Sequence, residues 1–377
     1  MLKFILLLLL VSNSFAALAA KNLVIVTIDG LRWQEVFHGA DLSLIDNKKF
    51  VENSVLLKDK YWRASKNERR EVLMPFIWKT VAKQGVIIGD RDIGSKMSVA
   101  NNWYFSYPGY SEIFTGVADN SINSNKKIAN KNVSFLEWLN NNNSFKGNVA
   151  AFGGWDVFPY IFNTKRSHLY VNAGFMPLTE TTTGYAISQD MKLLNQLQKE
   201  VPSPWHNVRF DSFTYRFAKD YLLNKKPRVL TISLGETDDF AHDGHYDQYI
   251  KSTQRSDAFI ADLWHTIQNT AGYKDNTVLL ITTDHGRGSS AQDWQHHASK
   301  LATETYMKDL NKFKNGIVGS NNIWFAAIGA DIKPQGEIVP DKEIKQNQIA
   351  ATALTLLGED PKAFNAQAGE PIMEILK

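Results

Sequence analysis

The sequence LVIVTI at residues 23–28, followed directly by Asp29-Gly30, decides the fold. A continuous run of apolar and β-branched residues is typical of a strand buried on both faces, as in a parallel sheet covered by helices. Open α/β sheets bind their ligands at the carboxyl ends of such strands. The run therefore predicts an α/β fold and places the Asp29 carboxylate at the ligand-binding edge, although Asp-Gly is also an ordinary turn.

Similar apolar runs recur along the chain and alternate with helical patterns, which indicates a mostly parallel central sheet with helices on both faces. The other expected strands are 149–152, 229–234, 278–283 and 323–328, and the expected helices are 71–84, 134–141, 187–200, 247–270 and 348–357. No internal repeat or linker divides the sequence. We expect one domain at 20–377 with inserted segments near the site, and the polar, aromatic stretch at about 156–207 is the candidate insertion.

Composition excludes several classes of protein. With 44% hydrophobic residues in 377, the chain has enough apolar material for a large core, so it is not disordered. Its 42 Lys and Arg and 39 Asp and Glu give a net charge of +3 without a long basic run, so no nucleic-acid-binding surface is evident. Cys is absent, which excludes disulfides, cysteine-ligated metals and a cysteine nucleophile. Any metal chemistry must use His, Asp and Glu.

The first residues have the pattern of a secretory signal. Lys3 precedes an apolar run at 4–11, and small residues follow at 17–19. A membrane anchor is the alternative, but that run is shorter than the roughly 20 residues a spanning helix needs. We expect a signal peptide at 1–19, no membrane span after its removal, and a secreted protein of a bacterial periplasm. The sequence does not predict an oligomeric state.

Metal-ligand residues follow three of the expected strands. Asp29 follows the first, Asp284-His285 the strand at 278–283, and Asp238 and His242 the strand at 229–234. The spacing of Asp238 and His242 lets one helical turn direct both side chains to one cation. The later pair at 296–297 supplies another His. Each motif by itself is also compatible with an ordinary polar loop.

Together these residues form two sets of three ligands. One set is Asp29, Asp284 and His285, and the other is Asp238, His242 and a late His. Two zinc-type ions about 3.5 to 4 Å apart can clamp the attacking and leaving oxygens of a phosphoryl transfer. Ser106, just before a helical pattern, is the candidate nucleophile because helix N-terminal N–H groups suit phosphate oxygens. The alternative is that Ser106 caps this helix.

The order of these motifs resembles the alkaline phosphatase superfamily, most closely its type I phosphodiesterase/nucleotide pyrophosphatase branch and related exported phosphatase-like metalloenzymes. The resemblance covers most of the mature chain, including the segment 106–116 and the small residue after His297. It implies a phosphoseryl intermediate on Ser106 and two divalent ions, with zinc the expected metal, acting on a small-molecule phosphate ester. The metal ligands it implies are Asp29, Ser106, Asp238, His242, Asp284, His285 and His297.

Two positions depart from related patterns. The pyrophosphatase branch has Asn where this chain has Gly109, and the sulfatase motif ends in Arg where this chain has Tyr110. Phosphodiesterase or nucleotide pyrophosphatase activity is therefore the first alternative to phosphate ester hydrolysis in general. A sulfatase-like hydrolase and a non-catalytic metal-containing binding protein of the envelope follow. The sequence does not separate monoesters from diesters.

Three further residues are candidate substrate contacts. Arg91 and Arg287 are candidate clamps for a phosphate oxygen, because a guanidinium can donate two parallel hydrogen bonds. Both are otherwise ordinary surface cations. Trp155, in the Gly-rich turn after the strand at 149–152, is a candidate wall of the substrate pocket, and packing against the inserted segment is the alternative.

Overall fold

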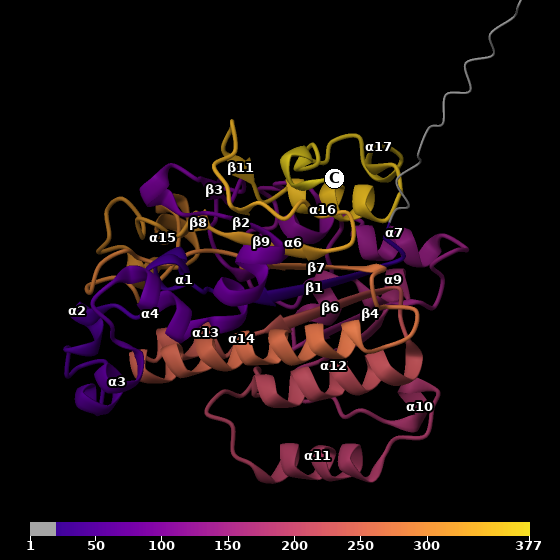
Figure 1. Cartoon of the computed structure of the whole chain (residues 1–377), viewed down its shortest axis with the longest axis horizontal. Coiled ribbons are helices and arrows are strands. Elements are labelled where there is room, and N and C mark those ends of the chain that lie inside the picture. The colour runs from indigo at the N-terminus through magenta and orange to yellow at the C-terminus, as the bar shows by residue number, and fades with distance from the viewer. Residues whose placement is uncertain (1–19) are drawn as a thin grey trace, which may run out of the picture.

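A computed structural model describes residues 20–377 and shows a large sheet between two layers of helices (Figure 1). Within these residues the main sheet has the strand order β10-β2-β9-β7-β1-β6-β4-β5. Strands β5, β4, β6, β1 and β7 run parallel, whereas β9 is antiparallel to both of its neighbours. The mostly parallel sheet is thus confirmed. The strands are β1 (Asn22–Ile28), β2 (Gly85–Ile88), β4 (Val149–Gly153), β5 (Tyr170–Ala173), β6 (Val229–Leu234), β7 (Thr277–Thr282), β9 (Phe325–Gly329) and β10 (Gly336–Glu337).

The central strand β1 is buried along its whole length, as its apolar run predicts. Val24, Val26 and Ile28 point into one hydrophobic core, and Leu23 and Ile25 point into another on the opposite face. Alternate residues of a strand face opposite sides of the sheet, so a strand covered on both faces needs an unbroken apolar sequence.

Each face of the sheet is covered by its own group of helices (Figure 1). Helices α12 (Asp211–Lys225) and α14 (Tyr246–Gln268) contribute Phe217 and Leu263 to the first core. Helices α6 (Ser106–Thr115), α7 (Phe135–Asn141) and α16 (Gln348–Leu356) contribute Phe114, Leu136 and Leu354 to the second. Helix α13 (Glu236–His242) directly follows β6 and carries part of the site.

The remaining elements are short. A small sheet combines β3 (Met97–Ser98), β8 (Asn322–Ile323) and β11 (Ile344–Lys345). The other helices are α1 (Trp33–His38), α2 (Leu42–Ile45), α3 (Ser54–Tyr61), α4 (Lys66–Leu73), α5 (Ala82–Gln84), α8 (Phe158–Ile161), α9 (Thr164–Ser167), α10 (Glu180–Thr183), α11 (Gln189–Glu200), α15 (Lys300–Thr305) and α17 (Pro361–Phe364).

Two sequence predictions were wrong in detail. The expected helix at 71–84 is interrupted, because α4 ends before Met74-Pro75 and proline cannot supply a helical N–H in the middle of a helix. The expected strand at 323–328 is two strands, β8 and β9, separated by Trp324. The Trp324 indole donates a hydrogen bond to the Leu31 carbonyl at 3.0 Å, where the chain passes from the small sheet to the large one.

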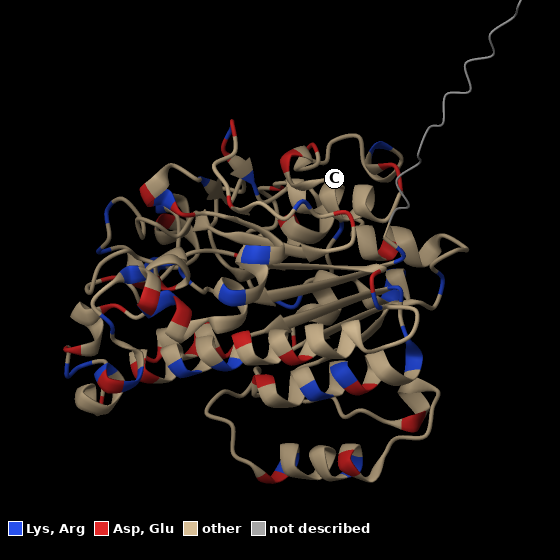
Figure 2. Ribbon diagram, in the orientation of Figure 1, with Lys and Arg blue, Asp and Glu red and all other residues tan. Residues whose placement is uncertain are grey.

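The candidate insertion at about 156–207 contains α8, α9, β5, α10 and α11. Strand β5 extends the main sheet at its edge, and α11 lies outside α12, away from the sheet (Figure 1). The predicted signal peptide lies outside the described residues. From residue 20 onward, no helix has the length and apolarity needed to cross a membrane. Acidic and basic residues are interleaved along the described part of the chain (Figure 2).

Candidate active site

The predicted metal ligands meet at one edge of the sheet, where parallel strands β1, β6 and β7 end. Asp29 follows β1 directly, and Asp284 and His285 come just after β7. Helix α13, which carries Asp238 and His242, begins two residues after β6 ends. Because neighbouring parallel strands place their carboxyl ends together, segments far apart in sequence converge here.

Asp29, Asp284 and His285 form what we call the buried group. The His285 Nε2 atom lies 3.4 Å from Asp29 Oδ1 and 3.4 Å from Asp284 Oδ2. Asp284 and His285 are fully buried, and Asp29 is 6% exposed. The Gly30 N–H donates to Asp284 Oδ1 at 3.1 Å, which fixes this carboxylate relative to the end of β1.

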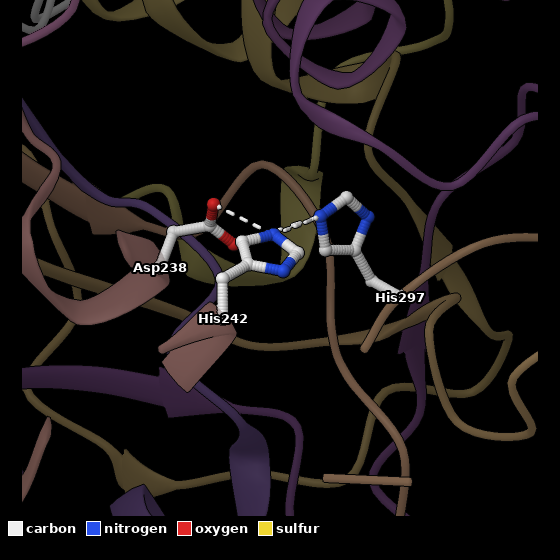
Figure 3. A group of neighbouring side chains, drawn as sticks. All are labelled: Asp238, His242 and His297. Carbon is white, nitrogen blue, oxygen red and sulfur yellow. Dashed lines mark hydrogen bonds and ion pairs between the residues drawn. The ribbon is translucent and has the colours of Figure 1, made fainter. Parts of the chain in front are cut away.

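Asp238, His242 and His297 form the open group (Figure 3). The His242 Nε2 atom lies 3.2 Å from Asp238 Oδ2 and 3.0 Å from His297 Nε2. The His242 side chain is 40% exposed, whereas His297 is almost completely buried. The spacing of four residues on α13 does bring Asp238 and His242 together, as the sequence predicted.

The two groups are parts of one centre. Asp238 Oδ1 lies 3.8 Å from His285 Nε2 and 3.6 Å from His297 Nε2, so Asp238 faces both groups. The His285 and His297 rings are stacked with their centroids 3.8 Å apart. The two sets of three expected from the sequence therefore adjoin, and Asp29, Asp238 and His285 also lie close enough to one another to hold one ion.

Backbone carbonyls fix the ring orientation of two histidines and favour the tautomer whose Nε2 atom is free to bind a metal ion. The Nδ1–H of His285 faces the Gly286 carbonyl at 2.9 Å, and the Nδ1–H of His297 faces the Tyr104 carbonyl at 3.1 Å. Donation from Nδ1 leaves the lone pair on Nε2, which in both residues points into the centre. Tyr104 has a left-handed φ of 58°, so this local backbone conformation aims its carbonyl at His297.

The charges of the centre are strongly coupled. Burial raises the pKa of Asp29 well above its ordinary value, and the carboxylates of Asp284 and Asp238 raise it further. Burial also raises the pKa of Asp284. Burial opposes ionisation of Asp238 as well, but His242 and Arg287 outweigh it and hold the pKa of Asp238 well below its ordinary range. The centre thus brings several carboxylates together in a buried place, and a bound cation would stabilise their charged forms.

The donor atoms fit divalent ions. Asp29 Oδ1 and Asp284 Oδ2 are buried and have no hydrogen-bond partner among the described residues. Leaving a buried carboxylate oxygen without a partner is costly, and a cation between these oxygens and His285 Nε2 would remove that cost. Carboxylate oxygens and imidazole nitrogens in sets of three are typical of zinc sites.

Ser106 is the first residue of α6, and its Oγ atom lies 3.3 Å from His285 Nε2. Ser106 is 6% exposed and lines the active-site cavity. The preceding residue, Phe105, is the helix N-cap, and no side chain caps this end. The serine hydroxyl is therefore directed at the ligand centre instead of at its own helix backbone.

Helix α6 packs tightly against the buried group. A Cβ atom at Gly109 would lie 2.4 Å from the Asp284 carbonyl oxygen, so no side chain fits there without displacing the Asp284 backbone. The next residue, Tyr110, donates from its hydroxyl to Asp29 Oδ2 at 3.0 Å. The two departures noted in the sequence therefore have structural roles. Gly109 permits close packing of α6 against Asp284, and Tyr110 orients the Asp29 carboxylate.

Neither predicted arginine clamp lines the cavity. Arg287 is buried, donates from Nη1 to Asp238, and donates from Nε to the Trp294 carbonyl at 3.1 Å. Its remaining nitrogen donates to the Gln295 carbonyl, so Arg287 holds Asp238 and the segment before His297. Arg91 donates to the Met97 carbonyl at 3.1 Å and is likewise outside the cavity lining.

The active-site cavity has a volume of about 440 Å³. Trp155 lines it, as one of the two sequence interpretations proposed, and also packs against Phe158. Sequence reasoning missed the polar wall formed by Asn125, Lys126, Lys127, His206 and Asn207. The polar run at 125–127, shortly after α6, was the signal in the sequence for this wall.

Comparison with protein families matches residues 45–354 to a model described as type I phosphodiesterase/nucleotide pyrophosphatase. No curated protein matches the chain. The fold is similar to the alkaline phosphatase PafA, at 13% identity and a TM-score of 0.58, covering 95% of this chain and 99% of that one.

Two other solved structures extend the likeness in fold. A 2-O GAG sulfatase has 14% identity and a TM-score of 0.58, with 94% of this chain and 73% of that chain covered. The lipoteichoic acid synthase LtaP from Listeria monocytogenes has 11% identity and a TM-score of 0.53, with 90% and 72% covered.

Proposed function

Since this chain belongs to the type I phosphodiesterase/nucleotide pyrophosphatase family and is a hydrolase acting on phosphate esters, we propose that it is an exported two-ion phosphohydrolase with Ser106 as its nucleophile. The observation that carries the proposal is the position of Ser106 Oγ, 3.3 Å from His285 Nε2 at the edge of the ligand centre. A hydroxyl in this position faces both the ligands and the open cavity.

The residues that would hold the ions are the two groups described above. Asp238, His242 and His297 would hold one. Asp29 and His285 would hold the other, with Asp284 beside them and Asp238 also within reach, and Ser106 would add a further oxygen ligand. When bound, such ions lower the pKa of nearby hydroxyls and neutralise charge on the reacting oxygens. Zinc is the proposed metal because it favours mixed nitrogen and oxygen donors.

The chain's own residues position the reaction. Ser106 Oγ forms a bond to phosphorus as the bond from phosphorus to the leaving oxygen breaks, which gives a phosphoserine and the free alcohol. Water then attacks phosphorus from the vacated side, releases inorganic phosphate or a phosphate monoester, and restores the Ser106 hydroxyl. The Gly286 carbonyl fixes the His285 ring, whose Nε2 atom lies 3.3 Å from Ser106 Oγ, so the nucleophile and this ligand face the same point of the centre.

The cavity wall supplies groups for the remaining phosphate oxygens. Asn125 accepts a hydrogen bond from the Tyr107 N–H at 3.0 Å, which fixes its side-chain amide beside the first turn of α6. Lys126 and Lys127 add positive charge to the same wall. Because Arg287 is committed to Asp238 and two carbonyls, we assign phosphate contacts to this wall in its place.

A panel of four substrates tests the proposal with the zinc-loaded protein: an aryl phosphate, an aryl phosphodiester, an aryl phosphonate ester and an aryl sulfate. We expect hydrolysis of at least one of the first three and negligible turnover of the sulfate, and the ratio between monoester and diester assigns the subclass. If none of the four is hydrolysed, the result would favour a non-catalytic metal-containing binding protein. Efficient turnover of the sulfate would favour a sulfatase-like hydrolase.

A further inference from the structure

A second cavity of about 600 Å³ adjoins the active-site cavity, and we call it the lateral cavity. Lys127 and Asp156 line both cavities, and their ion pair, with 2.6 Å between Lys127 Nζ and Asp156 Oδ2, forms the partition between them. The Lys127 side chain is 47% exposed. Ion pairs this exposed contribute little stability, so a bound molecule can displace the lysine at small cost.

The lateral cavity has a different character from the polar site beside it. Tyr160, Phe175 and Met176 line it and remain 37%, 38% and 42% exposed, and Pro159 and Ala173 add further apolar wall. Large apolar side chains gathered in a hollow are typical of a binding site, whereas single exposed ones are ordinary. Because the hollow shares Lys127 and Asp156 with the active-site cavity, its occupant is best sought in the substrate itself.

Asp156 supplies a second observation that points to a ligand. Its Oδ1 atom is buried yet accepts no hydrogen bond within the described part of the chain. Gly174, with φ of 55°, lies so close that a Cβ there would be 2.6 Å from Asp156 Cβ, so the aspartate is held firmly. A fixed, buried acceptor without a donor favours a ligand that brings a hydroxyl or an amine to this point.

We propose that the lateral cavity binds the second organic arm of a phosphodiester substrate, and that this arm is aromatic or apolar with a hydrogen-bond donor near the phosphate. This inference rests on the proposed function, because it places the phosphate at Ser106 and the ligand centre. The arm passes the Lys127–Asp156 partition, its donor faces Asp156 Oδ1, and its apolar end contacts Phe175 and Met176.

The test keeps the leaving group constant and varies the second arm. Phosphodiesters of 4-nitrophenol carry methyl, 3-phenylpropyl or 3-hydroxy-3-phenylpropyl as the other ester. We expect kcat/KM to rise about tenfold or more from methyl to phenylpropyl, and to rise again with the hydroxyl. The variant Phe175→Ala/Met176→Ala should bring the phenylpropyl-to-methyl ratio of kcat/KM close to one.

Two variants make the test specific. Leu193→Ala removes an exposed apolar side chain on α11, outside the cavity lining, and should leave every ratio unchanged. Asp156→Asn should remove the advantage of the hydroxylated arm over the plain one while the preference for phenylpropyl over methyl remains. An unchanged phenylpropyl-to-methyl ratio in the Phe175/Met176 variant would overturn the proposal.

A binding measurement separates this inference from the proposed function. Calorimetric titration of the zinc-loaded protein with 3-phenylpropylphosphonate and with methylphosphonate reports affinity without turnover. Tighter binding of the phenylpropyl compound, lost in the Phe175/Met176 variant, supports the lateral cavity even if no ester is hydrolysed. Equal affinity for the two phosphonates in the wild-type protein would contradict it even if esters are hydrolysed.

Discussion

The buried group and the open group meet at Asp238, which belongs to the open group and also faces His285. The chain supports the two groups in different ways. The buried group is fixed by strand ends, by the Gly30 N–H and by the Tyr110 hydroxyl. The open group combines a helix with the segment before His297, which Arg287 holds, and its His242 is 40% exposed. We infer that the sheet fixes the positions of the buried group before an ion binds. The open group is assembled from separate segments, so an ion bound there should exchange more readily.

The largest expected effect comes from the buried group. Asp284→Ala should remove one ion and lower turnover by about ten-thousandfold or more, because the proposed site would lose a fully buried carboxylate whose Oδ2 has no hydrogen-bond partner among the described residues. Metal analysis and kinetics measure both. Asp239→Asn, which changes the carboxylate next to Asp238 on the cavity wall, is the matched control and should keep both ions. An Asp284→Ala protein that retained two ions would show that Asp284 is not a ligand.

Ser106→Ala separates ligation from chemistry. The variant should keep both ions, because six other ligands remain, but turnover should fall by about a thousandfold or more. Ser106→Thr should keep partial activity, since it preserves the hydroxyl. Near wild-type turnover by the alanine variant would instead mean that water attacks the substrate directly.

Variants of the two neighbouring residues His296 and His297 test the open group. His297 Nε2 points into the centre, whereas the His296 ring packs near Phe313 with 5.8 Å between centroids. His297→Ala should therefore weaken binding of the second ion by about a hundredfold or more, and His296→Ala should change it little. Competition with a chromogenic zinc chelator measures both affinities, and the reverse ranking would contradict the assignment.

The smallest expected effect is a pH dependence of the metal-free protein. Burial and neighbouring carboxylates raise the pKa of Asp29 above its unfolded value, so its contribution to stability is greatest at low pH and is lost as pH rises through the raised pKa. Metal-free protein should show a Tm that falls as pH rises above the ordinary aspartate pKa of about 3.9. Asp29→Asn or zinc loading should flatten this slope, and an unchanged slope in Asp29→Asn would assign it to other groups.

The parts of the site that follow strands could be predicted from the sequence. Asp29 and Asp284 come directly after apolar runs, and Asp238 and His242 have helical spacing, so local pattern was enough to bring them together. The choice of His297 over His296 came from the family pattern, and the structure places the His297 ring in the centre.

Other parts depended on contacts that no local pattern encodes. Arg287 is two residues from His285, yet its guanidinium points to Asp238 and two carbonyls, a direction that the sequence does not specify. The cavity wall at Lys127 and Asn207 comes from loops without periodicity. The break at Pro75 could have been predicted, because proline is a known helix breaker.

The stereochemical course at phosphorus tests the central claim most directly. A single enantiomer of a phosphorothioate diester, hydrolysed in ¹⁸O-water by the zinc-loaded protein, reports how many displacements occur. Attack by Ser106 followed by attack by water inverts phosphorus twice, so the account predicts net retention of configuration. Net inversion would show a single direct displacement by water and would contradict the proposed phosphoserine.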